Sequence, residues 1–124
     1  MNDAEHVRRL DALVARIDSA ADHVFSAAER LSNEVDEAEA REVDEYRDAL
    51  RVGSRTSRRW RRLEKLDDYA DATTESVVAW MKRANDIYAE RPTGRWRRWR
   101  QCHRLLSIAR YFERAAARLE TVHP

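Results

Sequence analysis

Arginine and tryptophan cluster in two short segments, residues 58–62 and residues 95–104, and neither segment contains an acidic residue. We call these the first and the second Arg/Trp segment, and we count Lys65 with the first because helical spacing puts it on the same face. Arginine binds phosphate through two parallel hydrogen bonds, and an exposed indole ring can stack on an unpaired base. The residues that we expect to contact nucleic acid are Arg58, Arg59, Trp60, Arg61, Arg62, Lys65, Arg95, Trp96, Arg97, Arg98, Trp99, Arg100 and Arg104.

The spacing in the second Arg/Trp segment sorts its side chains onto two adjacent helix faces. One face holds three arginines and the next holds two tryptophans and a histidine, namely Arg97, Arg100 and Arg104, then Trp96, Trp99 and His103. Such an arginine face could follow a phosphate backbone, with an affinity that falls as salt rises. Two other interpretations stay open. The tryptophans could belong to the core, and the arginines could be solvated or paired with the acidic residues of 34–48.

Paired carboxylates suggest a different chemistry. Glu34 and Glu37 are three residues apart, as are Glu64 and Asp67. Together with the string Asn-Glu-Val-Asp-Glu-Ala-Glu-Ala at 33–40, this pattern resembles the all-α nucleotide pyrophosphohydrolases of the MazG type, in which four carboxylates on neighbouring helices hold Mg²⁺. The resemblance implies that these four residues bind Mg²⁺, a cation that prefers oxygen ligands. The alternative is a solvated acidic face.

Histidine and cysteine offer little further chemistry. Arg98 and His103 fit the Arg-x4-His pattern and so resemble the HEPN ribonucleases, which would make His103 a catalytic base; the alternative is an ordinary interfacial histidine. The four histidines and Cys102 show no zinc-binding spacing. The sequence also lacks a glycine-rich phosphate loop and a nucleophile elbow. We therefore expect no cofactor and no enzymatic activity.

Length and composition are typical of one helical domain. The 124 residues include only two Gly and two Pro, and 38% are charged. Residues 1–50 carry a formal charge of −8 and residues 51–124 one of +9, so the net charge of +1 hides a strong asymmetry. A single cysteine cannot form an internal disulfide, which favours a reducing compartment. The sequence contains no apolar run long enough to span a membrane and no signal-peptide pattern. We therefore expect a cytoplasmic protein with no membrane association.

Apolar residues recur at three- and four-residue intervals, and no stretch alternates with period two, so the sequence predicts helices and no strands. Both Arg/Trp segments should therefore lie on helices. The interval pattern from Val7 to Ala38 changes phase near Glu42, and Ser32-Asn33 could cap a new helix, so we expect a break there. Further breaks are expected at Gly53 and at Thr93-Gly94. The predicted helices cover about 3–31, 34–52, 57–89 and 95–121.

The predicted fold is all-α, a single domain over residues 1–124 built as an antiparallel bundle of three to four long helices. In size, helical content and paired basic segments (58–62 and 95–104), the chain resembles the small subunits of CRISPR effector complexes. This resemblance implies a non-enzymatic subunit that binds RNA or DNA inside a larger ribonucleoprotein or defence complex, with protein partners that include copies of itself. A coiled-coil scaffold without nucleic acid is the remaining alternative.

Overall fold

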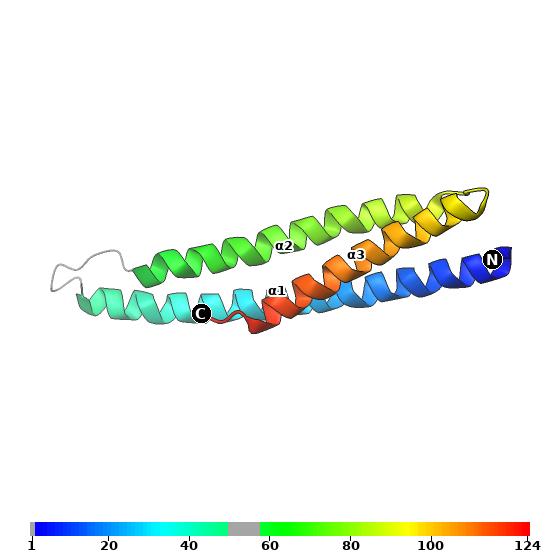
Figure 1. The fold of residues 1–124 in the computed structure, drawn as a ribbon. Coiled ribbons are helices and arrows are strands. Elements are labelled where there is room, and N and C mark those ends of the chain that lie inside the picture. The colour runs from blue at the N-terminus through cyan, green and yellow to red at the C-terminus, as the bar shows by residue number, and fades with distance from the viewer. Residues whose placement is uncertain (1, 50–57) are drawn as a thin grey trace.

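The computed structural model describes residues 2–49 and 58–124, with the backbone alone for residues 46–49. These residues form three α-helices, α1 (Asp3–Ala49), α2 (Arg58–Ala89) and α3 (Arg95–Thr121), and contain no strand (Figure 1). The all-α prediction is confirmed, and the predicted bounds of the last two helices agree with α2 and α3. The break expected at Gly53 lies outside the described residues.

The helices run alongside one another, with α2 returning beside α1 and α3 following the direction of α1 (Figure 1). The Tyr88 hydroxyl donates to Asp11 over 2.7 Å and the Ser32 hydroxyl donates to Asp67 over 3.2 Å, which fixes α2 against α1 in opposite directions. Arg16 binds Glu113 through nitrogen–oxygen contacts of 2.6–3.2 Å. This ion pair joins α1 to α3 and lowers the pKa of the Glu113 carboxyl.

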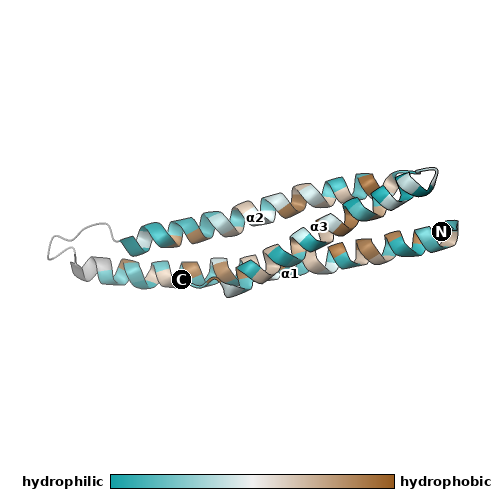
Figure 2. Ribbon diagram, in the orientation of Figure 1, coloured by the Kyte–Doolittle hydropathy of each residue, from teal (hydrophilic) through white to brown (hydrophobic). Residues whose placement is uncertain are grey.

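One buried seam runs between the helices, as the three- and four-residue spacing predicts. Its largest fully buried side chains come from all three helices, with Ile17 and Leu31 from α1, Val77 from α2, and Leu105 and Phe112 from α3. Burying each such side chain contributes roughly 1.5–3 kcal/mol. Figure 2 shows hydrophobic residues at intervals along α1 and α3, whereas the first turns of α2 are mainly hydrophilic.

Three residues that the spacing predicts in the seam are exposed instead. Val7 keeps 51% of its surface, Trp80 40% and Trp99 49%. Near Val7 the buried position is taken by His6, whose Nε2 lies 2.7 Å from the Gln101 side-chain oxygen. Polar side chains therefore replace apolar ones where the three helices meet at this end.

The break predicted at Ser32-Asn33 is wrong, because α1 is continuous from Asp3 to Ala49. Leu31 and Val35 are both fully buried, so the helix must continue through this region to keep them in the core. A helix cap contributes about 1 kcal/mol, which is less than the burial of either side chain. Ser32 instead uses its hydroxyl to bind α2.

The phase change in the seam falls in the part of α1 that α3 does not reach, because α3 is much shorter than α1. The last turn of α3 lies beside Arg30, whose Nη2 donates to the Leu119 carbonyl over 2.6 Å, and His123 lies 3.3 Å from Glu34. Beyond this level α1 packs on α2 alone (Figure 1). We call this part the two-helix end, meaning residues 36–49 and 58–66. The opposite end holds the N-terminus and the turn from α2 to α3.

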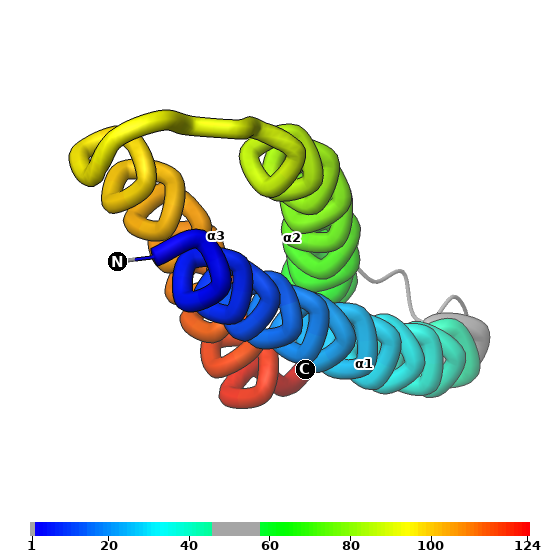
Figure 3. Tube along the Cα trace, turned by 90° about the vertical axis from the view of Figure 1, so that its right-hand side faces the viewer, coloured from blue at the N-terminus to red at the C-terminus, as the bar shows by residue number. Residues whose placement is uncertain are grey.

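That turn follows Ala89 and ends at Gly94, so the break predicted at Thr93-Gly94 is confirmed. Gly94 has φ +85°, a conformation that favours glycine, and its carbonyl accepts the Arg98 amide over 3.2 Å. The turn bridges α2 and α3 at the end that faces the viewer in Figure 3. Inside it, the Gln101 amide donates to the carbonyls of Ile87 and Glu90 and so closes the last turn of α2.

Candidate nucleic-acid interface

The second Arg/Trp segment forms the first three turns of α3, where its aromatic rings stack into a ladder. The ring centroids of Trp96 and Trp99 are 5.1 Å apart at an interplanar angle of 20°, and those of Trp99 and His103 are 5.0 Å apart at 8°. Trp96 exposes 68% of its surface. Helical spacing of three and four residues puts the rings one above another, and we call these three residues the aromatic ladder. Its tryptophans are outside the core.

Arginines flank the ladder on both sides. Arg98 pairs with Asp3 of α1, and Arg104 Nη1 lies 3.1 Å from Glu90. Arg95, Arg97 and Arg100 are exposed and have no ion pair with any described residue. Positive charge therefore remains uncompensated beside the rings.

This charge also sits at the wrong end of a helix for stability. The first turn of α3 contains no acidic residue, and Gly94 supplies no side-chain cap. A helix N-terminus is the positive end of the helix dipole, so a basic residue there costs about 0.3–1 kcal/mol, whereas an anion is stabilised. The arginines therefore lower the stability of the helix N-terminus, whereas a bound anion would raise it.

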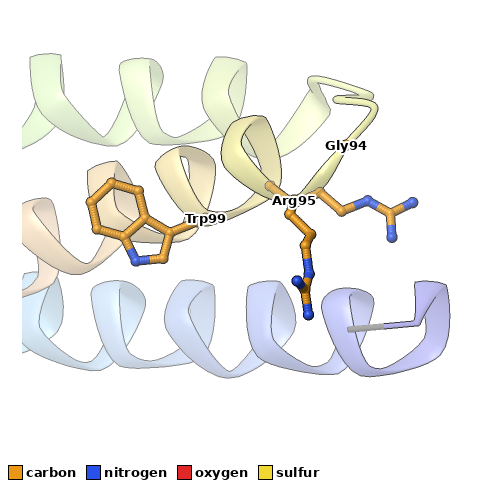
Figure 4. A pocket seen from close by; sticks show the side chains of 4 residues that line it. Gly94, Arg95 and Trp99 are labelled. Atoms are coloured by element: carbon orange, nitrogen blue, oxygen red, sulfur yellow. The ribbon is translucent and has the colours of Figure 1, made fainter.

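Two open hollows accompany the segment. The first is lined by Gly94, Arg95, Arg98 and Trp99, and Figure 4 shows the Trp99 ring projecting from α3 over α1 beside it. The second lies beside the α2–α3 turn, with a volume of about 400 Å³. We call the second one the arginine hollow, because its lining includes four arginines: Arg91, Arg97, Arg100 and Arg104.

The first Arg/Trp segment opens α2 at the two-helix end, so the two segments lie at opposite ends of the molecule (Figure 1). The Arg59 guanidinium lies 3.9 Å from both Glu42 and Glu45 of α1. The Trp60 indole N–H donates to Glu64 over 2.8 Å. The remaining basic residues of this segment are exposed: Arg58, Arg61, Arg62 and Lys65.

The four carboxylates of the proposed Mg²⁺ site are not assembled around a common point. Glu34 binds Arg30 over 2.8 Å and His123, which lowers the pKa of the Glu34 carboxyl, mainly through the Arg30 hydrogen bond. Glu64 and Asp67 accept hydrogen bonds from Trp60 and Ser32. In the described part of the chain, no group of three or more His, Cys, Asp or Glu side chains could hold a metal ion. The geometry thus gives the MazG-like alternative no support.

The Arg98/His103 pair is not assembled either, because Arg98 binds Asp3 on α1 while His103 stacks on Trp99. Cys102 is buried beneath the ladder, with its sulfur 3.8 Å from His6 Nδ1. Burial raises the pKa of the Cys102 thiol and keeps it in the unreactive protonated form. Neither group forms a catalytic arrangement.

Sequence reasoning missed a second aromatic cluster next to the ladder. Trp80 of α2 and Tyr111 of α3 meet with ring centroids 6.4 Å apart, and the Arg83 guanidinium lies 5.5 Å from the Trp80 ring centroid. The spacing of Trp80 predicts a core residue, and only the pairing of α2 with α3 reveals its exposed position. Two exposed arginines that continue the face of the aromatic ladder, Arg110 and Arg114, could have been found from their spacing of seven and eleven residues after His103.

Compared with known proteins, the chain matches no family model, no curated protein and no solved structure. Among the described residues, no helix combines the length and apolar character needed to cross a membrane.

Proposed function

We propose that this protein binds nucleic acid without enzymatic activity, using the second Arg/Trp segment as its principal contact surface. The observation that supports this most directly is the exposed aromatic ladder, which lies beside three arginines with no ion pair to any described residue, Arg95, Arg97 and Arg100. An exposed tryptophan pair contributes little to the core, and clustered exposed aromatic surface is typical of an interaction site, which supports the proposal.

The chemistry of the surface fits a single strand best. Arg95, Arg97 and Arg100 would bind phosphate oxygens through charge-assisted hydrogen bonds. The outer face of Trp96 would stack on an unpaired base, which contributes about 1–3 kcal/mol and tolerates any base. Because phosphate contacts position a strand without specifying its sequence, we expect weak sequence preference.

The same proposal includes the setting in which the protein works. We propose an antiparallel three-helix bundle that acts in the cytoplasm within a larger ribonucleoprotein or defence complex, similar to the small subunits of CRISPR effector complexes. Self-association is part of this expectation, although most of the α1 seam is already covered by α2 and α3. A self-contact would therefore have to use exposed surface such as Val7 or Val43.

The direct test is a set of binding titrations with single- and double-stranded DNA and RNA at several salt concentrations. We expect the tightest binding to single strands, with an affinity that falls as salt rises because counterions are released. Heparin, a polyanion without bases, is the matched control and should bind more weakly at equal charge. Equal binding of heparin and single strands would show that the surface binds polyanions through charge alone. The absence of binding to any of these ligands would favour the scaffold alternative.

A further inference from the structure

An open groove between α2 and α3 lies next to the aromatic ladder and has a volume of about 420 Å³. Its floor is formed by the buried side chains of Ile87 and Ile108, and its aromatic wall by Trp80 and Tyr111, each 40% exposed. Ser76 and Tyr111 share a hydrogen bond of 2.7 Å between their hydroxyls, which holds the tyrosine ring in place. The groove is thus a preformed, mainly apolar surface with fixed rings.

The rim of the groove is polar and basic. His103, Arg104 and Ser107 line one side, and Arg83 stands over the Trp80 ring on the other. His103 is also the last ring of the aromatic ladder. The ladder and the groove therefore share His103 and adjoin each other, and the one acidic residue that lines the neighbouring arginine hollow, Glu90, is paired with Arg104.

Arg104 also lines the arginine hollow, so the groove and that hollow share a side chain. The ion pair with Glu90 engages Nη1 of Arg104, which leaves Nη2 and Nε to bind a phosphate oxygen. Arg97 and Arg100 extend the hollow away from the groove. An apolar slot for a flat ring and a basic hollow for an anion thus lie side by side.

We propose that the α2–α3 groove binds one base of a single-stranded nucleic acid, with the adjoining phosphate held in the arginine hollow. This inference rests on the proposed function and adds a defined base site to it. A nucleotide carries a flat, largely apolar ring next to a charged phosphate, and this pairing of chemistries is what the groove and hollow present. The volume lies within the range of about 300–1,000 Å³ that is usual for small-ligand sites.

The test fills the groove and leaves the arginines in place. Ser107 is an exposed residue on its rim, so Ser107→Phe adds a ring to the groove without disturbing the core. Asn85→Phe is the matched control, because Asn85 is also an exposed polar residue, lies on α2 and does not line the groove. Each protein is titrated with a 12-nucleotide oligothymidine and with an abasic strand of the same length. Circular dichroism checks that helicity is unchanged.

We expect Ser107→Phe to weaken oligothymidine binding by about 5- to 150-fold, the effect of losing one stacked base. Binding to the abasic strand and the salt dependence should stay at wild-type values, and Asn85→Phe should behave as wild type. A second variant, Trp80→Ala, removes one of the two rings of the aromatic wall and should also give a base-dependent loss.

Two results would overturn the inference while the proposed function stands: wild-type affinity of both groove variants for oligothymidine, or an equal loss on the abasic strand. If wild-type protein binds neither strand, the proposed function and the inference fall together.

Discussion

The two Arg/Trp segments have nearly the same composition and very different surroundings. Each begins a helix and has no acidic residue in its first turn. At the start of α2, Arg59 faces Glu42 and Glu45, and Trp60 is bound to Glu64. At the start of α3, the tryptophans stack on each other and several arginines face solvent. Composition alone therefore does not make a binding surface, because the charges of the neighbouring helix determine which arginines remain available to a ligand.

The neighbour of the first segment is the acidic half of α1. Since α2 returns beside α1, Arg59 near the start of α2 meets Glu42 and Glu45 of α1, whereas Arg58, Arg61 and Arg62 are exposed. The second segment lies beside the start of α1 and the end of α2, where Asp3 and Glu90 each neutralise one arginine. This difference predicts that the second segment carries most of the binding.

The largest effect should come from changing Arg97, Arg100 and Arg104 together to Gln. Each charge-assisted hydrogen bond contributes roughly 1.5–3 kcal/mol, so single-strand affinity should fall by about 100-fold or more at low salt. The log–log salt slope should fall by about 0.7 for each lost phosphate contact. Titrations at several salt concentrations measure both quantities.

The matched control for this variant is Arg58, Arg61 and Arg62 changed together to Gln. It removes the same charge at the other end of the molecule and should change affinity much less. Equal losses from the two triple variants would show that the two segments contribute alike to binding.

A smaller loss is expected from Trp96→Ala. Removing one stacking ring should weaken single-strand binding by about 1–3 kcal/mol and leave duplex binding nearly unchanged. Because Trp96 is mostly exposed, thermal stability should stay close to wild type. Trp60→Ala serves as the comparison and should leave binding almost intact, since the Trp60 ring is held by Glu64. Fluorescence quenching by oligothymidine provides the readout.

The acidic neighbours of the first segment provide a gain-of-binding test. In the double variant Glu42→Gln with Glu45→Gln, Arg59 loses both contacts and becomes available to phosphate. Because the two contacts are long and Arg59 is mostly exposed, we expect them to contribute only about 0–1 kcal/mol, so affinity should rise a few-fold and the single-strand salt slope should rise by about 0.7. An unchanged slope would mean that Glu42 and Glu45 do not mask this segment.

The smallest effect should be a pH-dependent change in stability at Glu39 of the two-helix end. Burial, with the nearby charges of Asp36, Asp67 and Glu64, raises the pKa of the Glu39 carboxyl. Its stabilising contribution is therefore complete below the ordinary pKa of 4.5 and is lost as pH rises through the higher folded value.

Glu39→Gln should then raise the melting temperature at pH 7 by about 2 °C, with no difference near pH 3.5. The exposed Glu37→Gln, two residues away, is the control and should have no such effect. Thermal unfolding followed by circular dichroism at both pH values measures the melting temperatures and tests this prediction. A gain at pH 3.5 equal to that at pH 7 would contradict the burial effect.

Much of the fold follows from local signals in the sequence. Gly94 and Pro92 mark the turn, and the apolar spacing of α3 from Cys102 to Leu119 predicts its buried face. The break predicted at Ser32-Asn33 is wrong because a capping sequence carries no information about burial, and the burial of Leu31 and Val35 keeps α1 continuous. The phase change near Glu42 lies beyond the end of α3, and no local pattern in α1 encodes where α3 ends.

The candidate site was less predictable than the fold. The sequence identifies the basic residues, but spacing leaves Trp99 open between core and surface and favours a core position for Trp80, although both are exposed. On α3 the buried stripe includes Gln101, a polar residue that binds the carbonyls of Ile87 and Glu90. Since those carbonyls belong to α2 and to the turn after it, the sequence of α3 gives no indication that Gln101 points inward and the tryptophans outward.

The early end of α3 also gives the molecule a gradient of local stability. Near Ile17 and Phe112 every helix has two neighbours, whereas the two-helix end has a single packed interface. Opening of a segment costs less free energy where fewer apolar contacts hold it. Amide hydrogens of residues 36–45 and 58–66 should therefore exchange with solvent before those of α3, so the first Arg/Trp segment starts a frayed helix while the second is held on a rigid support. A strand that binds the rigid segment loses less affinity to ordering the protein than one that binds the frayed segment.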